Sequence, residues 1–193
     1  MERVLINSDK YTGKYVAIVS AEDNTIIGSG STPQEALSAA ENKGFKNPFL
    51  FFVPADNLVH IYYAGWKLSI YDNQTRRYGK ALLPVTIVNP ENKRQLNVFA
   101  MLDTGADECA FPASFAAPLG HNLQSGYQKN VSTGNGISIA YGHTVNIKAF
   151  NFTAENVIID FMPNLYIPLL GVKSFLSNFI VKIDYPHKNF SIL

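Results

Sequence analysis

The residues best placed to do chemistry lie in the segment Leu102-Asp103-Thr104-Gly105-Ala106-Asp107. An apolar stretch leads into Asp103, so the sequence predicts a strand that leaves the core and ends in a turn of small residues carrying a carboxylate. We expect this carboxylate to be barely solvated. The Thr104 hydroxyl can hydrogen-bond to nearby backbone, and Gly105 lets another segment of the chain come close. Asp103 is therefore the candidate for activating a water molecule, although the tripeptide Asp-Thr-Gly alone is common by chance.

Two further segments accompany this turn. About 65 residues after Asp103 stands the apolar segment Ile167-Pro168-Leu169-Leu170-Gly171, followed by an expected helical turn over Val172 to Ser177. Between the two motifs, Thr133-Gly134-Asn135-Gly136-Ile137 has the glycine-rich composition of a tight hairpin turn. Alone, Leu-Leu-Gly is most often part of a core strand, and only its pairing with Asp103 makes it informative.

Together these motifs resemble the retropepsin-like aspartic proteases, the half-size members of retroviral type, over about residues 82–193. The resemblance implies a mainly β domain, a closed barrel with one short helix, in which the Leu-Leu-Gly strand passes beside the catalytic turn. It also implies an aspartic endopeptidase that hydrolyses a peptide or protein substrate as a homodimer. The two copies of Asp103 would then share one proton and activate a water, and no acyl-enzyme would form.

The resemblance assigns roles to individual positions. Asp103, Thr104 and Gly105 are the expected catalytic residues, with the Thr104 hydroxyls interlocking across the dimer axis. A mobile hairpin lid, the flap, is expected to carry residues 133–137 at its tip. The residues expected to bind substrate are Ala106, Asp107, Thr133, Gly134, Asn135, Gly136, Ile137 and Leu169.

The sequence departs from the family pattern after Gly171. Many retropepsins have an arginine there that pairs with the acid at the position of Asp107, whereas this chain has Val172 followed by Lys173. Lys173 or one of the pair Arg76-Arg77 is a candidate for the missing cation, and a solvated Asp107 is the alternative. The strength of the dimer depends on which applies.

Other interpretations compete with the protease. The retropepsin fold could serve as a catalytically silent dimeric scaffold that binds peptides, but a silent scaffold has no need to keep the acid at Asp103. A third possibility is an interaction protein whose working part is the N-terminal unit. Cys109 has no nearby histidine in the sequence to activate it and is expected to serve packing. The four histidines share no ligand spacing, and we expect no metal and no cofactor.

The first part of the chain predicts a small α+β domain, residues 1–72, in β-β-α-β order. Strands are expected over Tyr15–Val19, Thr25–Gly28 and Phe49–Val53, with a helix that Thr32 caps and Gly44 ends. A further strand is expected at 60–63. This unit weakly resembles a small prokaryotic domain of uncharacterised function, for which we expect docking, substrate presentation or dimer support. Trp66 is expected to anchor it to the second domain.

The polar stretch 71–79 predicts the boundary with the second domain, residues 73–193. Turn residues there separate short strand-like segments, the pattern of a small barrel or closed sandwich. The expected strands are Leu83–Val88, Gln95–Leu102, Ser138–Tyr141, Thr144–Ala149, Val157–Ile159 and Ile180–Ile183.

Composition excludes several classes of protein. Of the 193 residues, 47% are hydrophobic and 16% are charged, which is too apolar for a disordered chain. The 16 basic and 15 acidic residues nearly cancel, so we expect no nucleic-acid partner. No apolar stretch is long enough for a membrane span, and no secretory h-region opens the sequence. A single cysteine excludes an intramolecular disulfide, and we expect a cytoplasmic protein.

Overall fold

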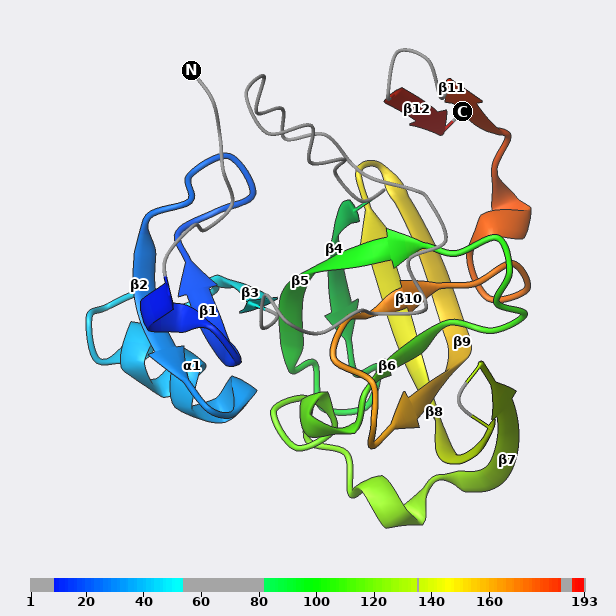
Figure 1. Ribbon diagram of the computed structural model, residues 1–193, viewed down its shortest axis with the longest axis horizontal. Helices are drawn as coiled ribbons and strands as arrows, with labels where there is room; N and C mark the ends of the chain where they lie inside the picture. Colours follow the sequence, from blue (N-terminus) through cyan, green and yellow to red (C-terminus); the bar gives the residue numbers. More distant parts are fainter. Residues whose placement is uncertain (1–8, 54–81, 135, 185–188, 193) are drawn as a thin grey trace.

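The computed structural model describes residues 9–53, 82–134, 136–184 and 189–192 (Figure 1). The described residues form a mainly β structure with one α-helix, as the sequence predicts. The predicted strand at 60–63, the anchor Trp66 and the boundary at 72/73 lie outside these ranges.

The N-terminal part has the predicted β-β-α-β order. It begins with a short 3-10 helix, η1 (Asp9–Tyr11), and continues as β1 (Lys14–Ile18), β2 (Ile26–Gly30), α1 (Pro33–Glu41) and β3 (Phe49–Val53). Thr32 caps α1 by accepting a hydrogen bond from the Glu35 N–H at 3.2 Å, and the Glu35 carboxylate accepts from the Ser31 N–H at 2.8 Å. After the helix, Gly44 adopts a positive φ of 88°, which favours glycine.

The remaining described residues are almost all strands. They are β4 (Leu82–Val88), β5 (Gln95–Leu102), β6 (Ala110–Pro112), β7 (Tyr127–Thr133), β8 (Gly136–Ala149), β9 (Phe152–Met162), β10 (Leu169–Leu170), β11 (Val181–Asp184) and β12 (Asn189–Ile192). Three short 3-10 helices connect them: η2 (Ala113–Phe115), η3 (Leu123–Ser125) and η4 (Leu176–Asn178). The predicted helical turn at 172–177 is therefore a 3-10 turn that begins later than expected.

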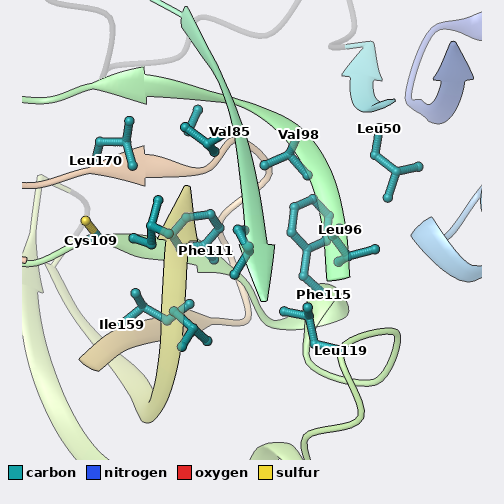
Figure 2. Close-up of a cluster of buried hydrophobic side chains, with 14 of the residues drawn as sticks. Leu50, Val85, Leu96, Val98, Cys109, Phe111, Phe115, Leu119, Ile159 and Leu170 are labelled. Carbon is teal, nitrogen blue, oxygen red and sulfur yellow. The ribbon is translucent and has the colours of Figure 1, made fainter. Parts of the chain in front are cut away.

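Strand pairing closes most of these strands into a ring. Strand β10 pairs with both β5 and β6, and the row β6-β9-β8-β4-β5 returns to the same β5. Strand β7 adds to the outer side of β8, whereas β11 and β12 form a separate hairpin, seen apart from the main sheet in Figure 1. The core of the ring contains Leu170, Phe111, Ile159 and Cys109, which Figure 2 shows converging.

Several strands differ from the sequence prediction. The two segments predicted at 138–141 and 144–149 form the single strand β8, because a glycine and a histidine between them are tolerated in an antiparallel pair. Strand β9 is longer than predicted: a two-residue turn at Phe150-Asn151, with Phe150 at φ 51°, replaces the expected longer turn. Strand β7 has a polar sequence and gives no hydrophobic signal.

The N-terminal part continues the main sheet. Strand β3 pairs in parallel with β5, with Leu50 opposite Val98, and β1 and β2 extend the sheet beyond it (Figure 1). The Tyr15 hydroxyl oxygen lies 3.2 Å from the Ser114 hydroxyl oxygen, and the Tyr15 ring packs against the Phe115 ring. Phe52 stacks on Tyr166 with ring centroids 4.9 Å apart. The two parts thus share one hydrophobic core, in which Tyr15 and Leu50 contact residues of the second part.

Candidate active site

The candidate catalytic turn directly follows β5. Strand β10 pairs in parallel with the end of β5, placing Leu170 opposite Leu102, and the Asp103 N–H donates to the Leu170 carbonyl at 3.1 Å. The start of the turn is therefore fixed by the second motif. The apolar pair before Gly171 explains this contact, because a strand that crosses a packed core requires apolar side chains.

The turn orients the Asp103 carboxylate. The Gly105 N–H donates to Asp103 Oδ1 at 2.9 Å, and the Ala106 N–H donates to the Asp103 carbonyl at 3.3 Å. Among the described residues, no other group hydrogen-bonds to this carboxylate. One oxygen of the carboxylate is thus held by the turn. Asp103 is half-buried and Thr104 and Gly105 are exposed, so the carboxylate is less buried among the described residues than the barely solvated position that the sequence predicts.

The second motif supports the turn over its whole length. The Val172 N–H donates to the Ala106 carbonyl at 2.9 Å, and the Lys173 N–H donates to the Asp107 carbonyl at 2.7 Å. Gly171 packs so closely that a Cβ atom there would lie 2.3 Å from the Glu108 carbonyl oxygen. The glycine is therefore required by close approach of two backbone segments rather than by a turn.

Lys173 is the cation that pairs with Asp107, a role for which the sequence offered more than one candidate. Its Nζ atom lies 3.0 Å from Asp107 Oδ2, and this hydrogen bond raises the pKa of Lys173. Both side chains are exposed, at 63% for Lys173 and 80% for Asp107, so solvent screens the pair. The other candidates, Arg76 and Arg77, lie outside the described residues.

The predicted flap segment is the end of the β7–β8 hairpin. Thr133 pairs with Gly136, which has a φ of 105°, and the Thr133 hydroxyl donates to the Gly136 carbonyl at 2.8 Å. Gly134 is exposed and Ile137 is 79% exposed, while Asn135 lies outside the described residues. The hairpin therefore presents an apolar side chain to solvent near its tip.

A second apolar cluster connects the hairpin with the strands around the turn. Its buried members are Leu82, Met101, Ala110, Ala140, Met162 and Leu169. Leu169 and Met101 flank the catalytic turn, whereas Ala140 belongs to the hairpin, and Val131 of β7 packs against the cluster from the hairpin side. Leu169, an expected substrate-binding residue, is only 7% exposed and belongs to this cluster rather than to the main core.

Cys109 has the expected packing role. Its side chain is fully buried among apolar residues (Figure 2), and its Sγ accepts a hydrogen bond from the Gly171 N–H at 3.3 Å. Burial raises the pKa of the thiol to about 12, so it holds its proton at physiological pH. Cys109 is therefore not a nucleophile in this fold.

Two histidines form a pair that the sequence did not predict. The rings of His121 and His143 lie 4.7 Å apart and both contact Phe161. His143 Nε2 lies 3.0 Å from the Leu123 carbonyl oxygen, whereas His121 Nε2 is buried with no partner among the described residues. Burial, reinforced by His143, lowers the pKa of His121. In the part of the chain that is described, no group of three or more His, Cys, Asp or Glu side chains is arranged to hold a metal ion.

A buried ion pair was also missed by sequence reasoning. Asp160 on β9 is 4% exposed, and its Oδ2 lies 3.0 Å from Lys129 Nζ on β7. Burial raises the pKa of Asp160, although Lys129 opposes the shift. The sequence feature that could have predicted the pair is the aspartate within the apolar run Val157 to Met162, because a charged side chain buried among apolar residues requires a partner.

The comparisons with known proteins agree with these motifs. The sequence model of the family described as "gag-polyprotein putative aspartyl protease" matches residues 92–178. A second model, of a family of unknown function (DUF5678), matches residues 8–56. No curated protein matches the chain. The resemblance predicted for both parts is confirmed: residues 92–178 match the aspartyl protease family model, and the model of the family of unknown function matches residues 8–56 before them.

Solved structures similar to this chain include two proteases and one protease-like domain. A retropepsin-like aspartic protease from Rickettsia conorii is 27% identical, with a TM-score of 0.43, over 58% of this chain and 89% of that one. EIAV protease complexed with the inhibitor HBY-793 is 17% identical, with a TM-score of 0.40, over 56% and 94%. The retroviral protease-like domain of Ddi1 from Leishmania major is 18% identical, with a TM-score of 0.43, over 60% and 90%.

The only α-helix in the described ranges is nine residues long, too short to cross a membrane.

Proposed function

We propose that this chain is an aspartic endopeptidase that acts as a homodimer, with Asp103 from each subunit forming one active site. The observation that carries the proposal is the Asp103 turn itself: at the end of β5 the Leu170 carbonyl accepts from the Asp103 N–H, and the Gly105 N–H donates to the Asp103 carboxylate. The match of residues 92–178 to an aspartyl protease family supports the same role.

A dimer follows from the count of catalytic acids. The sequence contains a single Asp-Thr-Gly, so one chain provides one such carboxylate. Two adjacent carboxylates in an aspartic-protease dyad cannot both ionise and therefore share one proton. A C2 axis beside the exposed Thr104 and Gly105 would bring the two Asp103 side chains together and exclude water from the turn.

The chemistry assigns opposite roles to the two acids. The ionised Asp103 takes a proton from a bound water, which attacks the carbonyl carbon of the scissile peptide bond. The protonated Asp103 of the other subunit donates its proton to the carbonyl oxygen, giving a tetrahedral intermediate. The Asp103 that took the proton from water then gives it to the leaving nitrogen, the C–N bond breaks, and one hydroxyl of the intermediate returns its proton to the other Asp103, so no covalent bond to the protein forms. Gly105 and the β7–β8 hairpin would bind the peptide through backbone groups as an added strand, with the hairpin closing as a flap. Ala106, Asp107, Leu169 and the tip residues 133–137 would line this groove.

The dimer interface would use the separate hairpin of β11 and β12. Its strands lie outside the main sheet, and Ile180 and Ile183 beside and within β11 are exposed apolar residues. The N-terminal part would dock partners, present substrate or reinforce the dimer, and we propose that the enzyme works in the cytoplasm. The boundary between the two domains is proposed at residues 72/73.

A peptide-library digest at several pH values, run with wild type and Asp103→Asn, tests the proposal. The substitution keeps the shape of the side chain and removes its ability to activate water, so we expect a folded dimer without cleavage. Cleavage at the wild-type rate by Asp103→Asn would contradict the mechanism. If neither form cuts any peptide but both bind peptides equally, the domain is a silent peptide-binding scaffold.

A further inference from the structure

The buried carboxylate of Asp160 has an unused oxygen. Its Oδ2 pairs with Lys129, but its Oδ1 is fully buried and has no hydrogen-bond partner among the described residues. A buried carboxylate oxygen without a partner is costly, so its persistence in a folded protein calls for an explanation, such as a bound water, ion or ligand. Asp160 is therefore a candidate for binding a donor from outside the described residues.

The strand register places Asp160 on the surface that surrounds the catalytic turn. Met101 pairs with Leu169, Leu169 with Ala110, and Ala110 with Asp160, one residue per strand across four strands. Because paired residues share a face of the sheet, Asp160 lies on the face of the second cluster, not on that of the main core. Three strand spacings of about 4.8 Å make roughly 14 Å between Asp160 and Met101, which precedes Asp103 by two residues.

The row continues onto the β7–β8 hairpin. The ladder partner of Asp160 on β8 is Gly142, which has no side chain, and the partner of Gly142 on β7 is Tyr127. Tyr127 is 76% exposed, and Ile158, on the same face of β9, is 58% exposed. A Cβ atom at Gly142 would lie 3.3 Å from Ile158 Cγ2 and 3.7 Å from Tyr127 Cβ, so these two exposed side chains meet over Gly142, next to Asp160. Their exposed apolar surface suits the aliphatic stem of a long side chain.

Two carboxylates and one ammonium group interact around Asp160. Lys129 pairs with Asp160 Oδ2, and the negative charge of Glu108 acts on Asp160. Glu108 itself accepts a hydrogen bond from the Ser174 hydroxyl, which also donates to the Ile158 carbonyl. The local balance is one uncompensated negative charge, which favours a cationic donor over a neutral one.

We propose that Asp160 determines specificity by binding an arginine or lysine side chain of the substrate, a few residues from the scissile bond. The basic group donates to Oδ1 while Lys129 stays on Oδ2, and the stem of the side chain lies along Tyr127 and Ile158. An extended peptide advances about 3.3 Å per residue, so the distance limits this residue to within about four positions of the cleaved bond. The assignment rests on the proposed peptidase function.

Matched peptides test the assignment. Each carries arginine, its neutral isostere citrulline or leucine at one position, scanned over about four residues on both sides of the cleaved bond. Wild type should prefer arginine to citrulline by about tenfold or more in kcat/KM at one position, the effect of a charge-assisted hydrogen bond. Asp160→Asn should lose the preference and still cleave the citrulline peptide. Glu155→Gln, on an exposed carboxylate of the same strand, should keep it.

A second variant gives an opposite prediction and guards against a purely structural effect. Lys129→Met leaves Asp160 without its partner and lets its pKa rise further, so the preference for arginine should increase at a pH high enough to ionise Asp160 and disappear below it. If Lys129 and Asp160 only fasten β7 to β9, both variants should lower cleavage of every peptide equally, and the assignment would be wrong.

Peptide binding separates this proposal from the peptidase itself. The same peptides are titrated against Asp103→Asn and against Asp103→Asn combined with Asp160→Asn, with fluorescence anisotropy as the readout. Tighter binding of the arginine peptide that is lost in the double variant supports Asp160 even if wild type cleaves nothing. Absence of an arginine preference in both cleavage and binding overturns it, whether or not Asp103-dependent cleavage is found.

Discussion

Replacing Gly171 by alanine tests how the second motif holds the catalytic turn. The added Cβ would lie 2.3 Å from the Glu108 carbonyl oxygen, 2.4 Å from the Glu108 carbonyl carbon and 2.9 Å from the Cys109 nitrogen. All three are backbone atoms, so no flexible side chain can move aside. The two segments must separate, which weakens the bond from the Gly171 N–H to Cys109 and the bond from the Val172 N–H to Ala106.

The cost can be estimated from similar overpacking in protein cores. Forcing extra atoms into a packed site costs about 1–3 kcal/mol. For a chain of this length, each kcal/mol lowers Tm by about 2–4 °C, so we expect a decrease of roughly 2–12 °C. Because the strain acts on the turn that orients Asp103, peptide cleavage should fall more than the folded fraction does.

Thermal and urea unfolding, followed by circular dichroism, measure the effect. Gly134→Ala is the matched control, because a Cβ there would have no atom within 4 Å, and its Tm should stay near that of wild type. An unchanged midpoint for Gly171→Ala would refute the close-approach argument.

Three further predictions concern other parts of the molecule. Activity should follow a bell-shaped pH profile with an optimum on the acidic side of neutral, because the two Asp103 carboxylates titrate as a pair. Cys109→Ser should leave this profile unchanged. A profile with a single limb, abolished by Cys109→Ser, would identify a cysteine enzyme instead. Because the pKa of His121 is lowered in the folded state, its stabilising contribution is present above about pH 6.5 and is lost as the pH falls below that value. His121→Phe should therefore reduce the difference in free energy of unfolding between pH 7 and pH 5. An unchanged difference would contradict this. Tyr15→Phe should lower the free energy of unfolding by about 1 kcal/mol through loss of its hydrogen bond to Ser114, as measured by urea titration, and no loss would show that this contact does not join the two parts.

Local signals in the sequence predicted much of the fold. The capping residues Thr32 and Glu35 identified the start of the helix, and alternating apolar residues identified β4 and β5. The polar strand β7 gave no such signal, because it depends on its pairing with β8 rather than on its own side chains. The joining of β3 to β5 was not predictable either, since it is a contact between distant segments.

Local sequence motifs also predicted part of the candidate site, whereas contacts between distant segments were not predicted. The Asp103 turn and the Leu169-Leu170 strand are short motifs with a chemical logic, and the structure places them in contact through Asp103 and Leu170. The ion pair of Asp160 with Lys129 joins β9 to β7, and nothing local in the sequence indicates which lysine faces that aspartate. Likewise, the choice of Lys173 as the partner of Asp107 depended on the fold.

Mixing experiments test the central claim, that two chains build one active site from two copies of Asp103. Wild type is mixed with increasing fractions of Asp103→Asn at fixed total concentration, after incubation that allows subunits to exchange, and peptide cleavage is measured. A dimer with one aspartate and one asparagine is inactive, so activity should fall with the square of the wild-type fraction, to about one quarter in an equal mixture. Mixing with Glu155→Gln should leave activity unchanged. A linear fall, to about one half in an equal mixture, would show that each chain works alone and would contradict the shared site.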